Sequence, residues 1–121
     1  MGEGTFLRSE RLVRADEFQT VFRRGKRVER PSVLVLWRGA RSSRKAGFAV
    51  SRQVQGAVRR NRARRRVREA YRQSRQVLSD GVWLVIVARP RAGTGPFSEI
   101  LRDMREALAT VAKGCRQAPE A

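Results

Sequence analysis

Hydrophobic residues recur with a helical period along three stretches of this chain. In the longest, residues 57–78, small and apolar residues follow one another at steps of four, three, four and three positions. This spacing places them on one side of an α-helix. The stripe consists of Ala63, Val67, Ala70, Ser74 and Val77, widened by Tyr71 and Leu78. We therefore predict a helix over residues 57–78 that buries this narrow side.

Two more amphipathic helices are predicted, one near each end of the chain. The first begins at about Asp16, an expected N-cap, and ends before Gly25, a residue favoured just after a helix. Its apolar positions are Phe18, Val21 and Phe22. The other helix runs from about Phe97 to Lys113 and is expected to end at Gly114. Its core-facing side consists of Ile100, Leu101, Met104, Leu108 and Val111.

Three other stretches have the composition of β-strands. Residues 28–38 are rich in β-branched and large apolar residues, and residues 45–51 alternate between apolar and small or polar residues. The intervening turn, residues 39–44, predicts that these two strands form a hairpin. Residues 82–88 are continuously apolar. Such a strand is expected at the centre of a sheet with both faces covered.

The order of these elements, α-β-β-α-β-α, predicts an α/β (α+β) two-layer sandwich. It would contain one small central mixed sheet and about three helices. Residues 52–56 form a polar link into the arginine-rich helix, and residues 89–96 form a loop rich in glycine and proline. With 121 residues the chain fits a single domain, residues 1–121. We expect residues 1–11 and 115–121 to be flexible tails.

Positive charge is concentrated in two parts of the chain. The net charge is +17. Residues 23–45 carry nine basic residues and Glu29, and residues 57–78 carry nine arginines and Glu69, so each window contributes +8. The remaining 76 residues contribute about +1. Localised charge of one sign predicts a polyanionic partner, which could be RNA, DNA or an anionic membrane surface.

The predicted helix over residues 57–78 holds the densest charge, because seven of the ten residues 59–68 are arginine. Only Glu69 offers an acidic partner within this helix, so the arginines repel one another. A bound polyanion would relieve that repulsion, which favours a nucleic-acid surface. The alternative is a charged face that only contacts solvent.

The aromatic pair Phe18 and Phe22 also has two interpretations. Aromatic residues at this spacing usually belong to a hydrophobic core. Beside cations they can instead form a stacking surface for unpaired bases. The neighbouring cations are Arg23, Arg24, Lys26 and Arg27.

Several classes of protein are disfavoured. The longest apolar run, Val82–Ala88, is far too short to span a bilayer, and no secretory signal pattern opens the sequence. A single cysteine, Cys115, has no disulfide partner. These features predict a cytoplasmic protein that does not enter membranes.

The sequence offers few catalytic side chains. It contains no histidine, so the commonest general base is missing, and one cysteine alone cannot form a zinc site. Asp103 and Glu106 share a helix face, but Arg102 and Arg105 alternate with them, which indicates surface ion pairs. We therefore expect no catalytic residue, no metal ligand and no independent catalysis.

Two motifs resemble the signature of the bacterial ribonuclease P protein family. They are Gly47-Phe-Ala-Val-Ser-Arg52 and the run from Ala57 to Tyr71, which contains the family's hallmark Arg60-Asn61-Arg62. The stretch from Arg11 to Gly25 resembles the family's first helix, and Ile86-Val-Ala-Arg-Pro90 its late strand. Together the similarity spans roughly residues 8–112 in the family's order.

This resemblance implies the auxiliary protein subunit of an endoribonuclease. Proteins of the family join a large catalytic RNA, and the complex removes the 5′ leader from precursor tRNA. The RNA supplies the active site with Mg²⁺, so the implied partners are the RNA subunit and precursor tRNA, with neither DNA nor a membrane. The family also has an unusual left-handed β-α-β crossover around its basic helix, against the usual right-handed rule.

The resemblance also implies two sets of binding residues. The basic helix would contact the RNA subunit through Arg59, Arg60, Asn61, Arg62, Arg64, Arg65, Arg66 and Arg68. A cleft between the first helix and the sheet would hold the leader through Phe18, Phe22, Arg52 and Trp37.

The chain departs from the family pattern at two places. In the link before the basic helix, Gln53 replaces the second cation of a basic pair, and Gly56 comes one position late. A tyrosine often faces the leader from the first strand, but Leu36 occupies that position here, with Trp37 beside it.

Two other functions fit the size and charge. A structural RNA-binding protein, such as a ribosomal protein, has similar properties. A DNA-binding module could place a basic helix in the major groove, but no zipper heptads or helix-turn-helix pattern accompany this helix.

Overall fold

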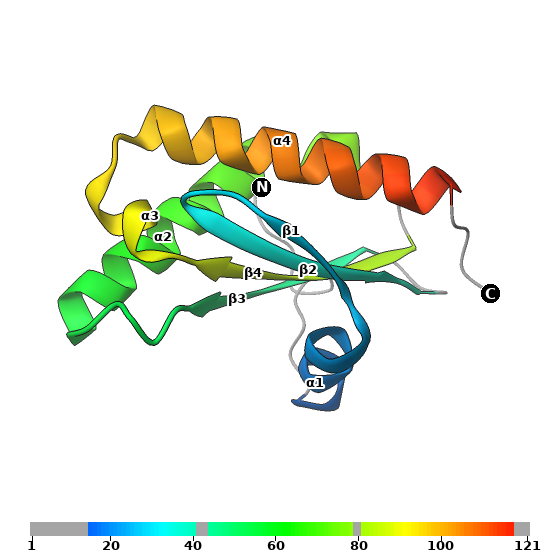
Figure 1. Cartoon of the computed structure of the whole chain (residues 1–121), viewed down its shortest axis with the longest axis horizontal. Coiled ribbons are helices and arrows are strands. Elements are labelled where there is room, and N and C mark those ends of the chain that lie inside the picture. Colours follow the sequence, from blue (N-terminus) through cyan, green and yellow to red (C-terminus); the bar gives the residue numbers. More distant parts are fainter. Residues whose placement is uncertain (1–14, 41–43, 79–80, 118–121) are drawn as a thin grey trace, which may run out of the picture.

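The computed structural model describes residues 15–40, 44–78 and 81–117. They form an α+β fold in which helices cover a four-stranded mixed sheet (Figure 1), as the sequence predicts. In chain order the elements are α1 (Ala15–Arg24), β1 (Lys26–Glu29), β2 (Val33–Gly39), β3 (Lys45–Val50), α2 (Ala57–Ser74), the 3-10 turn η2 (Arg75–Val77), β4 (Val82–Ala88), α3 (Pro90–Thr94) and α4 (Phe97–Gln117).

The strand β4 lies inside the sheet, whose order is β1-β2-β4-β3. It pairs antiparallel with β2 and parallel with β3, which confirms the central position predicted for residues 82–88. The predicted hairpin of β2 and β3 is therefore wrong, because β4 separates them. A strand as apolar as β4 is most stable with a neighbour on each side and cover on both faces.

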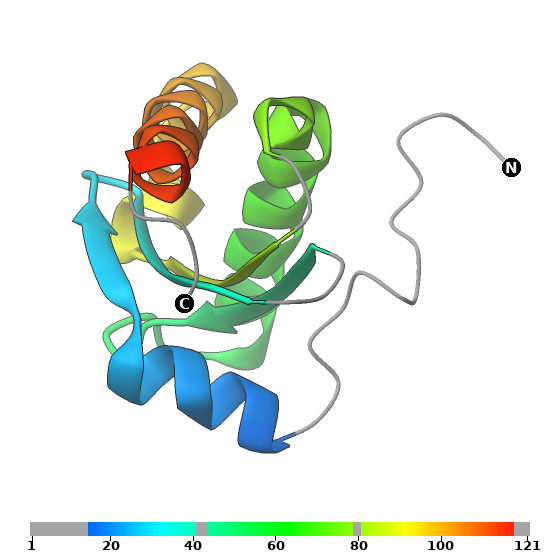
Figure 2. The same ribbon diagram turned by 90° about the vertical axis from the view of Figure 1, so that its right-hand side faces the viewer.

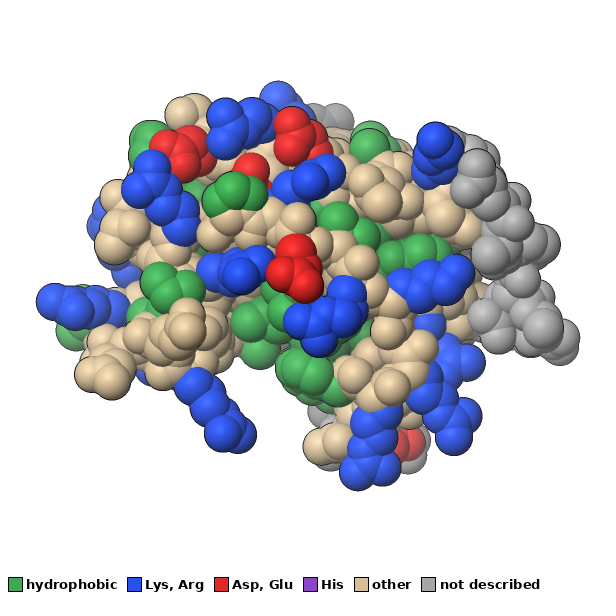
Figure 3. Space-filling view, viewed as in Figure 1, with side chains coloured by type: hydrophobic (Ala, Val, Ile, Leu, Met, Phe, Trp, Pro, Cys, Tyr) green, Lys and Arg blue, Asp and Glu red, His purple; other side chains and the backbone are tan. Residues whose placement is uncertain are grey.

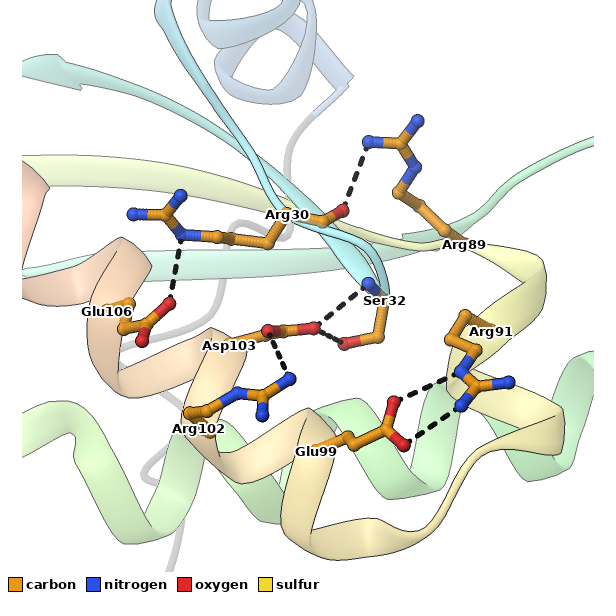
Figure 4. A network of polar contacts seen from close by, with 8 residues as sticks. All are labelled: Arg30, Ser32, Arg89, Arg91, Glu99, Arg102, Asp103 and Glu106. Atoms are coloured by element: carbon orange, nitrogen blue, oxygen red, sulfur yellow. Dashed lines mark hydrogen bonds and ion pairs between the residues drawn. The ribbon is translucent and has the colours of Figure 1, made fainter.

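The predicted strand over residues 28–38 is divided in two. A tight turn separates β1 from β2, and the amide of Arg30 donates to the carbonyl of Val33 across it (2.8 Å). Figure 4 shows that Asp103 of α4 holds this turn, because its carboxylate accepts from the amide (3.1 Å) and the hydroxyl (2.6 Å) of Ser32. Asp103 is buried, so its role is structural.

The helices are divided unequally between the two faces of the sheet. Figures 1 and 2 show α2, α3 and α4 on one face and α1 on the other. The parallel strands β3 and β4 are joined through α2. Viewed with α2 toward the reader and the two strands pointing up, β4 lies to the left of β3, so this crossover is left-handed (Figures 1 and 2), as the family resemblance implied.

Each face of the sheet has its own hydrophobic core. The larger core packs β2, β3 and β4 against α2 and α4, with Tyr71, Met104 and Leu108 fully buried. The smaller core joins Val21 of α1 to Leu36 of β2 and Val85 of β4. The sheet thus has one face for the basic helix and another for the aromatic helix.

Several predicted boundaries are corrected by the structure. Asp16 lies within the first turn of α1 and is not its N-cap. Within the predicted loop 89–96, Pro90 opens the one-turn helix α3. The helix α4 continues through Gly114 to Gln117, so the first part of the expected C-terminal tail is helical. Residues 1–14 and 118–121 lie outside the described part of the chain.

Gly114 is required for a reason other than ending a helix. A Cβ atom at this position would lie 2.7 Å from the indole ring of Trp37, which is closer than real contacts allow. The missing side chain therefore lets α4 pack directly on that buried ring.

Candidate nucleic-acid interface

The helix α2 separates a small buried side from a broad cationic side. Its buried residues are Ala63, Val67, Ala70, Tyr71 and Ser74, which match the predicted stripe. Val77 was also expected in the stripe but is 53% exposed, because the chain has turned into η2 at that point. Small residues on the buried side bring α2 close to the sheet and α4, and the arginines cover the rest of its circumference.

The N-terminus of α2 adds to the positive potential. Its N-cap is Gly56, which has a φ of 89° and provides no side-chain cap, and the first turn contains no acidic residue. A glycine suits this position because other residues rarely adopt a left-handed backbone. The positive end of the helix dipole is therefore not neutralised by α2 itself.

A shallow hollow on the outer side of α2 is lined by Val58, Asn61, Arg64, Arg65 and Arg68. We call these three arginines and Asn61 the arginine face. No ion pair or hydrogen bond involves the three guanidinium groups among the residues described. Their charges are available to an external anion.

Most acidic side chains elsewhere in the described chain are already paired with basic ones. Glu17 pairs with Lys45 (2.8 Å), Glu29 with Arg89 (3.6 Å) and Arg27, Glu99 with Arg91 (2.9 Å), and Glu106 with Arg30 (3.5 Å). Figure 3 shows acidic side chains lying among basic ones on the face that carries α4 and β1. The outer side of α2 thus carries positive charge that no described carboxylate offsets.

Arg60 lies in the same motif but points in another direction. Its guanidinium donates to the carbonyl oxygens of Ser51 (3.0 Å), Val54 (2.9 Å) and Val50 (3.3 Å). These acceptors belong to the end of β3 and the following turn. Arg60 therefore fastens the first turn of α2 to the segment that carries Arg52.

Two further predicted residues contact α3. Arg62 donates to the carbonyl of Gly93 (3.3 Å), and Arg66 donates to the carbonyl of Ala92 (2.8 Å). Partial burial, together with the charge of Arg62, lowers the pKa of Arg66 from its ordinary value, yet an arginine remains protonated. Arg59 is exposed and, with Arg62, lines a groove between α2, the 52–56 turn and α3.

The other face of the sheet carries the aromatic residues of α1. Phe18 is half-buried against the smaller core, whereas Phe22 is 46% exposed. Their ring centroids lie 5.3 Å apart. Phe22 is thus free to contact a ligand, while Phe18 has both a packing role and an accessible part.

The strand register supplies the remaining side chains of this face. Leu34, Val87 and Ala49 lie in one row across β2, β4 and β3, and all three are partly exposed. We call Phe18, Phe22 and this row the α1 surface. A hairpin of β2 and β3 would not contain this row, because β4 lies between the two strands. Side chains alternate between the two faces of a sheet along a strand, so Trp83, Val85 and Val87 share one face. This geometric alternation was the signal in the sequence that could have found the row.

Trp37 does not lie on the α1 surface. The sequence-based prediction that it lines the leader cleft is therefore wrong about its position. Side chains alternate along β2, and Leu36 faces α1 while Trp37 faces α4. The indole is only 5% exposed, with Lys26 above its ring (5.2 Å). Leu36, also buried, occupies the position expected from the family pattern. Trp83, whose ring lies under Lys45 (5.3 Å), is the tryptophan on the α1 side.

Arg52 is exposed in the turn that follows β3. It stands at the end of the sheet where α2 begins, held there through the Arg60 contacts described above. Along the chain, Arg52 lies between Ala49, which belongs to the α1 surface, and Gly56, the N-cap of α2.

Neither a metal-binding cluster nor a membrane-spanning helix occurs among the residues that the structure describes. No group of three or more His, Cys, Asp or Glu side chains could hold a metal ion. None of the helices there is long and apolar enough to cross a bilayer.

Comparison with known proteins identifies the family. The sequence model of the ribonuclease P family matches residues 6–112. A ribonuclease P protein component from Kocuria rhizophila is 39% identical over 108 residues, covering 87% of this chain and 94% of that protein. The ribonuclease P protein from Thermotoga maritima has a similar structure, with a TM-score of 0.67, 28% identity, and coverage of 87% of this chain and 96% of that one. The Staphylococcus aureus protein shares the fold at a TM-score of 0.72 and 20% identity, over 84% of this chain and 94% of that one. The cationic helix, the left-handed crossover and these matches together show that the chain belongs to the ribonuclease P protein family.

Proposed function

We propose that this chain is the protein subunit of ribonuclease P, a ribonucleoprotein that removes the 5′ leader of precursor tRNA. The arginine face of α2 binds the catalytic RNA subunit. The α1 surface and Arg52 bind the leader. The main observation in favour is that three adjacent guanidinium groups lack any partner in the described chain, while nearly every carboxylate elsewhere is paired.

Guanidinium groups suit this task because they donate to phosphate oxygens in a fixed, forked geometry. Each phosphate contact releases condensed counterions, so binding is strong at low salt and weakens as salt rises. An arginine-covered helix also reduces the repulsion between two RNA molecules, the RNA subunit and the precursor tRNA. The protein thereby lowers the Mg²⁺ concentration that the complex needs.

The leader is single-stranded, and proteins bind such segments by combining cations with apolar or aromatic contacts. The exposed ring of Phe22 and the row of Leu34, Val87 and Ala49 provide the apolar part. Arg52 provides a cation at the end of the sheet. The two interfaces lie on different faces of the molecule and meet near the start of α2, so one protein can contact the RNA subunit and the leader together.

The RNA subunit carries out the chemistry. Cleavage of a phosphodiester needs an activated nucleophile and stabilisation of developing charge, commonly by metal ions held on carboxylates. The carboxylates that the structure describes do not fit such a site, because they are dispersed and mostly paired with arginine or lysine. Mg²⁺ is therefore expected on the RNA subunit, and the assembly is expected in the cytoplasm.

Incubating purified protein with precursor tRNA and Mg²⁺, with and without any large RNA recovered with the tagged protein, tests this function. Leader removal should require the RNA, and it should need less Mg²⁺ when the protein is present. Cleavage at the mature 5′ end by nuclease-treated, RNA-free protein would contradict the assignment of the chemistry to the RNA. Recovery of ribosomes in place of one large RNA would favour a ribosomal protein.

A further inference from the structure

A second hollow lies on α2 beside the arginine face, and its chemistry is different. It opens on the side facing β3 and is lined by Phe48, Arg65, Arg68, Glu69 and Arg72. The first hollow, which contains the arginine face, is lined only by cations, an amide and one valine. This second hollow adds a carboxylate and an aromatic ring.

The carboxylate of Glu69 is fixed in place by its neighbours. Arg72 donates to both of its oxygens, with Nε 2.9 Å from Oε1, and Gln73 donates to Oε2 (2.8 Å). These hydrogen bonds, with Arg72 contributing most, lower the pKa of Glu69 to about 2. The hollow therefore contains a negative charge at neutral pH. The three arginines leave the hollow net positive, but the Glu69 carboxylate repels a phosphate placed directly beside it.

Glu69 can still accept another hydrogen bond. Among the described residues Oε1 accepts only from Arg72, and a carboxylate oxygen has two lone pairs. Beside it, Arg65 and Arg68 have donors without described partners. The hollow thus offers one acceptor next to several donors, which matches the edge of a nucleobase better than a phosphate.

Phe48 supplies an apolar wall. Its ring is partly buried and packs edge-on against Tyr71, with centroids 5.6 Å apart. Because Tyr71 is fully buried, this contact fixes the position of Phe48. A rigid apolar wall beside polar groups is a common feature of sites that hold unpaired bases.

We propose that this second hollow binds an unpaired RNA base that carries an exocyclic amino group. The amino group donates to Glu69, as cytosine does to acidic side chains in nucleic-acid complexes. Arg65 or Arg68 donates to an acceptor of the same base, and Phe48 contacts its ring. The base belongs either to the RNA subunit or to precursor tRNA. This inference rests on the proposed function, and it adds a site that reads a base to a helix otherwise suited to phosphates.

Glu69→Gln should change the affinity for the RNA subunit in opposite directions for base binding and for phosphate binding. If α2 contacts only phosphates, removal of a repelling charge should raise the affinity for the RNA subunit. If a base donates to Glu69, affinity should fall by about fivefold, because a hydrogen bond to a charged acceptor becomes a weaker one to a neutral amide oxygen. The salt dependence should stay unchanged, since no phosphate contact is removed. Glu106→Gln is the matched control, because it removes the same charge from the exposed side of α4.

Glu69 could instead act only by orienting Arg72. RNA affinity is therefore also measured for Glu69→Gln in a protein that already carries Arg72→Ala. A base contact predicts that Glu69→Gln still weakens binding in that background. If the loss disappears there, Glu69 works through Arg72 and the base site is refuted.

Chemical probing of base edges in the assembled complex identifies the source. One unpaired base, in the RNA subunit or in precursor tRNA, should be protected from dimethyl sulfate or kethoxal in the complex with the wild-type protein. The same base should react with the reagent in the complex with the Glu69→Gln protein. Protection in one RNA supports the proposal and names the source. If no base changes reactivity between the two proteins, or if Glu69→Gln raises affinity, the proposal is overturned. Failure of the wild-type protein to bind either RNA would refute the proposed function itself.

Discussion

Arg60 belongs to a motif that indicates RNA binding, yet its guanidinium donates to three carbonyl oxygens of its own chain. Its neighbour Arg59 is exposed and forms no such contact. Adjacent arginines with the same chemistry therefore have different tasks, one holding the turn at residues 51–54 and one facing outward. Residue type could not distinguish them, because the difference depends on where β3 ends relative to α2.

Replacement of Arg60 by alanine should therefore lower stability. The free energy of unfolding is expected to fall by about 1.5–3 kcal/mol, the usual range for hydrogen bonds involving a charged group. Urea unfolding of Arg60→Ala and Arg59→Ala provides the comparison, and the latter should change stability by no more than about 0.5 kcal/mol. Equal stability of the two variants would show that the Arg60 contacts do not hold the turn.

Gly114 provides a second residue-level test. Alanine is normally favoured over glycine inside a helix by about 1 kcal/mol. Here the new methyl group would meet the buried Trp37 ring at 2.7 Å, and overpacking of this kind costs about 1–3 kcal/mol. Gly114→Ala should therefore lower the melting temperature. Gly93→Ala is the control, since its methyl group would lie 3.9 Å from the nearest atom and should be tolerated. A stabilised Gly114→Ala protein would mean that α4 does not pack on the ring as described.

At the scale of elements, α1 has one buried side and one side available to a ligand. Val21 is fully buried, whereas Phe22, next to it, is 46% exposed. Phe22→Ala should weaken binding of tRNA that carries a leader by about 1–3 kcal/mol, while binding of mature tRNA and thermal stability stay nearly unchanged. Val21→Ala should show the reverse, with lower stability and no selective effect on the leader. Equal weakening of both tRNAs by Phe22→Ala would argue against a leader contact.

Elements with strong local patterns were predictable from the sequence. The stripe of Ala63, Val67 and Ala70 predicted the buried side of α2, and the continuous run of β4 predicted its central position. The neighbour of β3 was not predictable in this way. Consecutive strands usually pair, but here β4 comes between β2 and β3, and only the family resemblance implied such a crossover.

The candidate site was partly predictable for the same reason. The density of arginine on α2 was evident from residue counts. Its division into outward-facing residues and residues bonded to backbone carbonyls depends on tertiary packing. Trp37 was assigned to the wrong face of the sheet, because its role was inferred from sequence neighbours and not from the alternation along β2.

For the whole molecule, the central feature is an uneven distribution of charge. Acidic residues pair with arginine or lysine around α4, β1 and α3, whereas the arginine face has no acidic partner among the described residues. Part of the net charge of +17 therefore lies on one side of α2, where no described carboxylate offsets it. Long-range attraction by such a face should speed association with RNA and should weaken as salt rises.

The salt dependence of affinity for the RNA subunit tests this account most directly. Replacement of Arg64, Arg65 and Arg68 by alanine lowers the net charge from +17 to +14, and the same change results from replacing Arg102, Arg105 and Lys113 on α4. Alanine preserves helix propensity in both variants. If the arginine face binds phosphates, the slope of log affinity against log salt should become shallower by about 2–3 in the α2 variant and by much less in the α4 variant. Equal slopes for the two variants would show that the arginine face only contacts solvent.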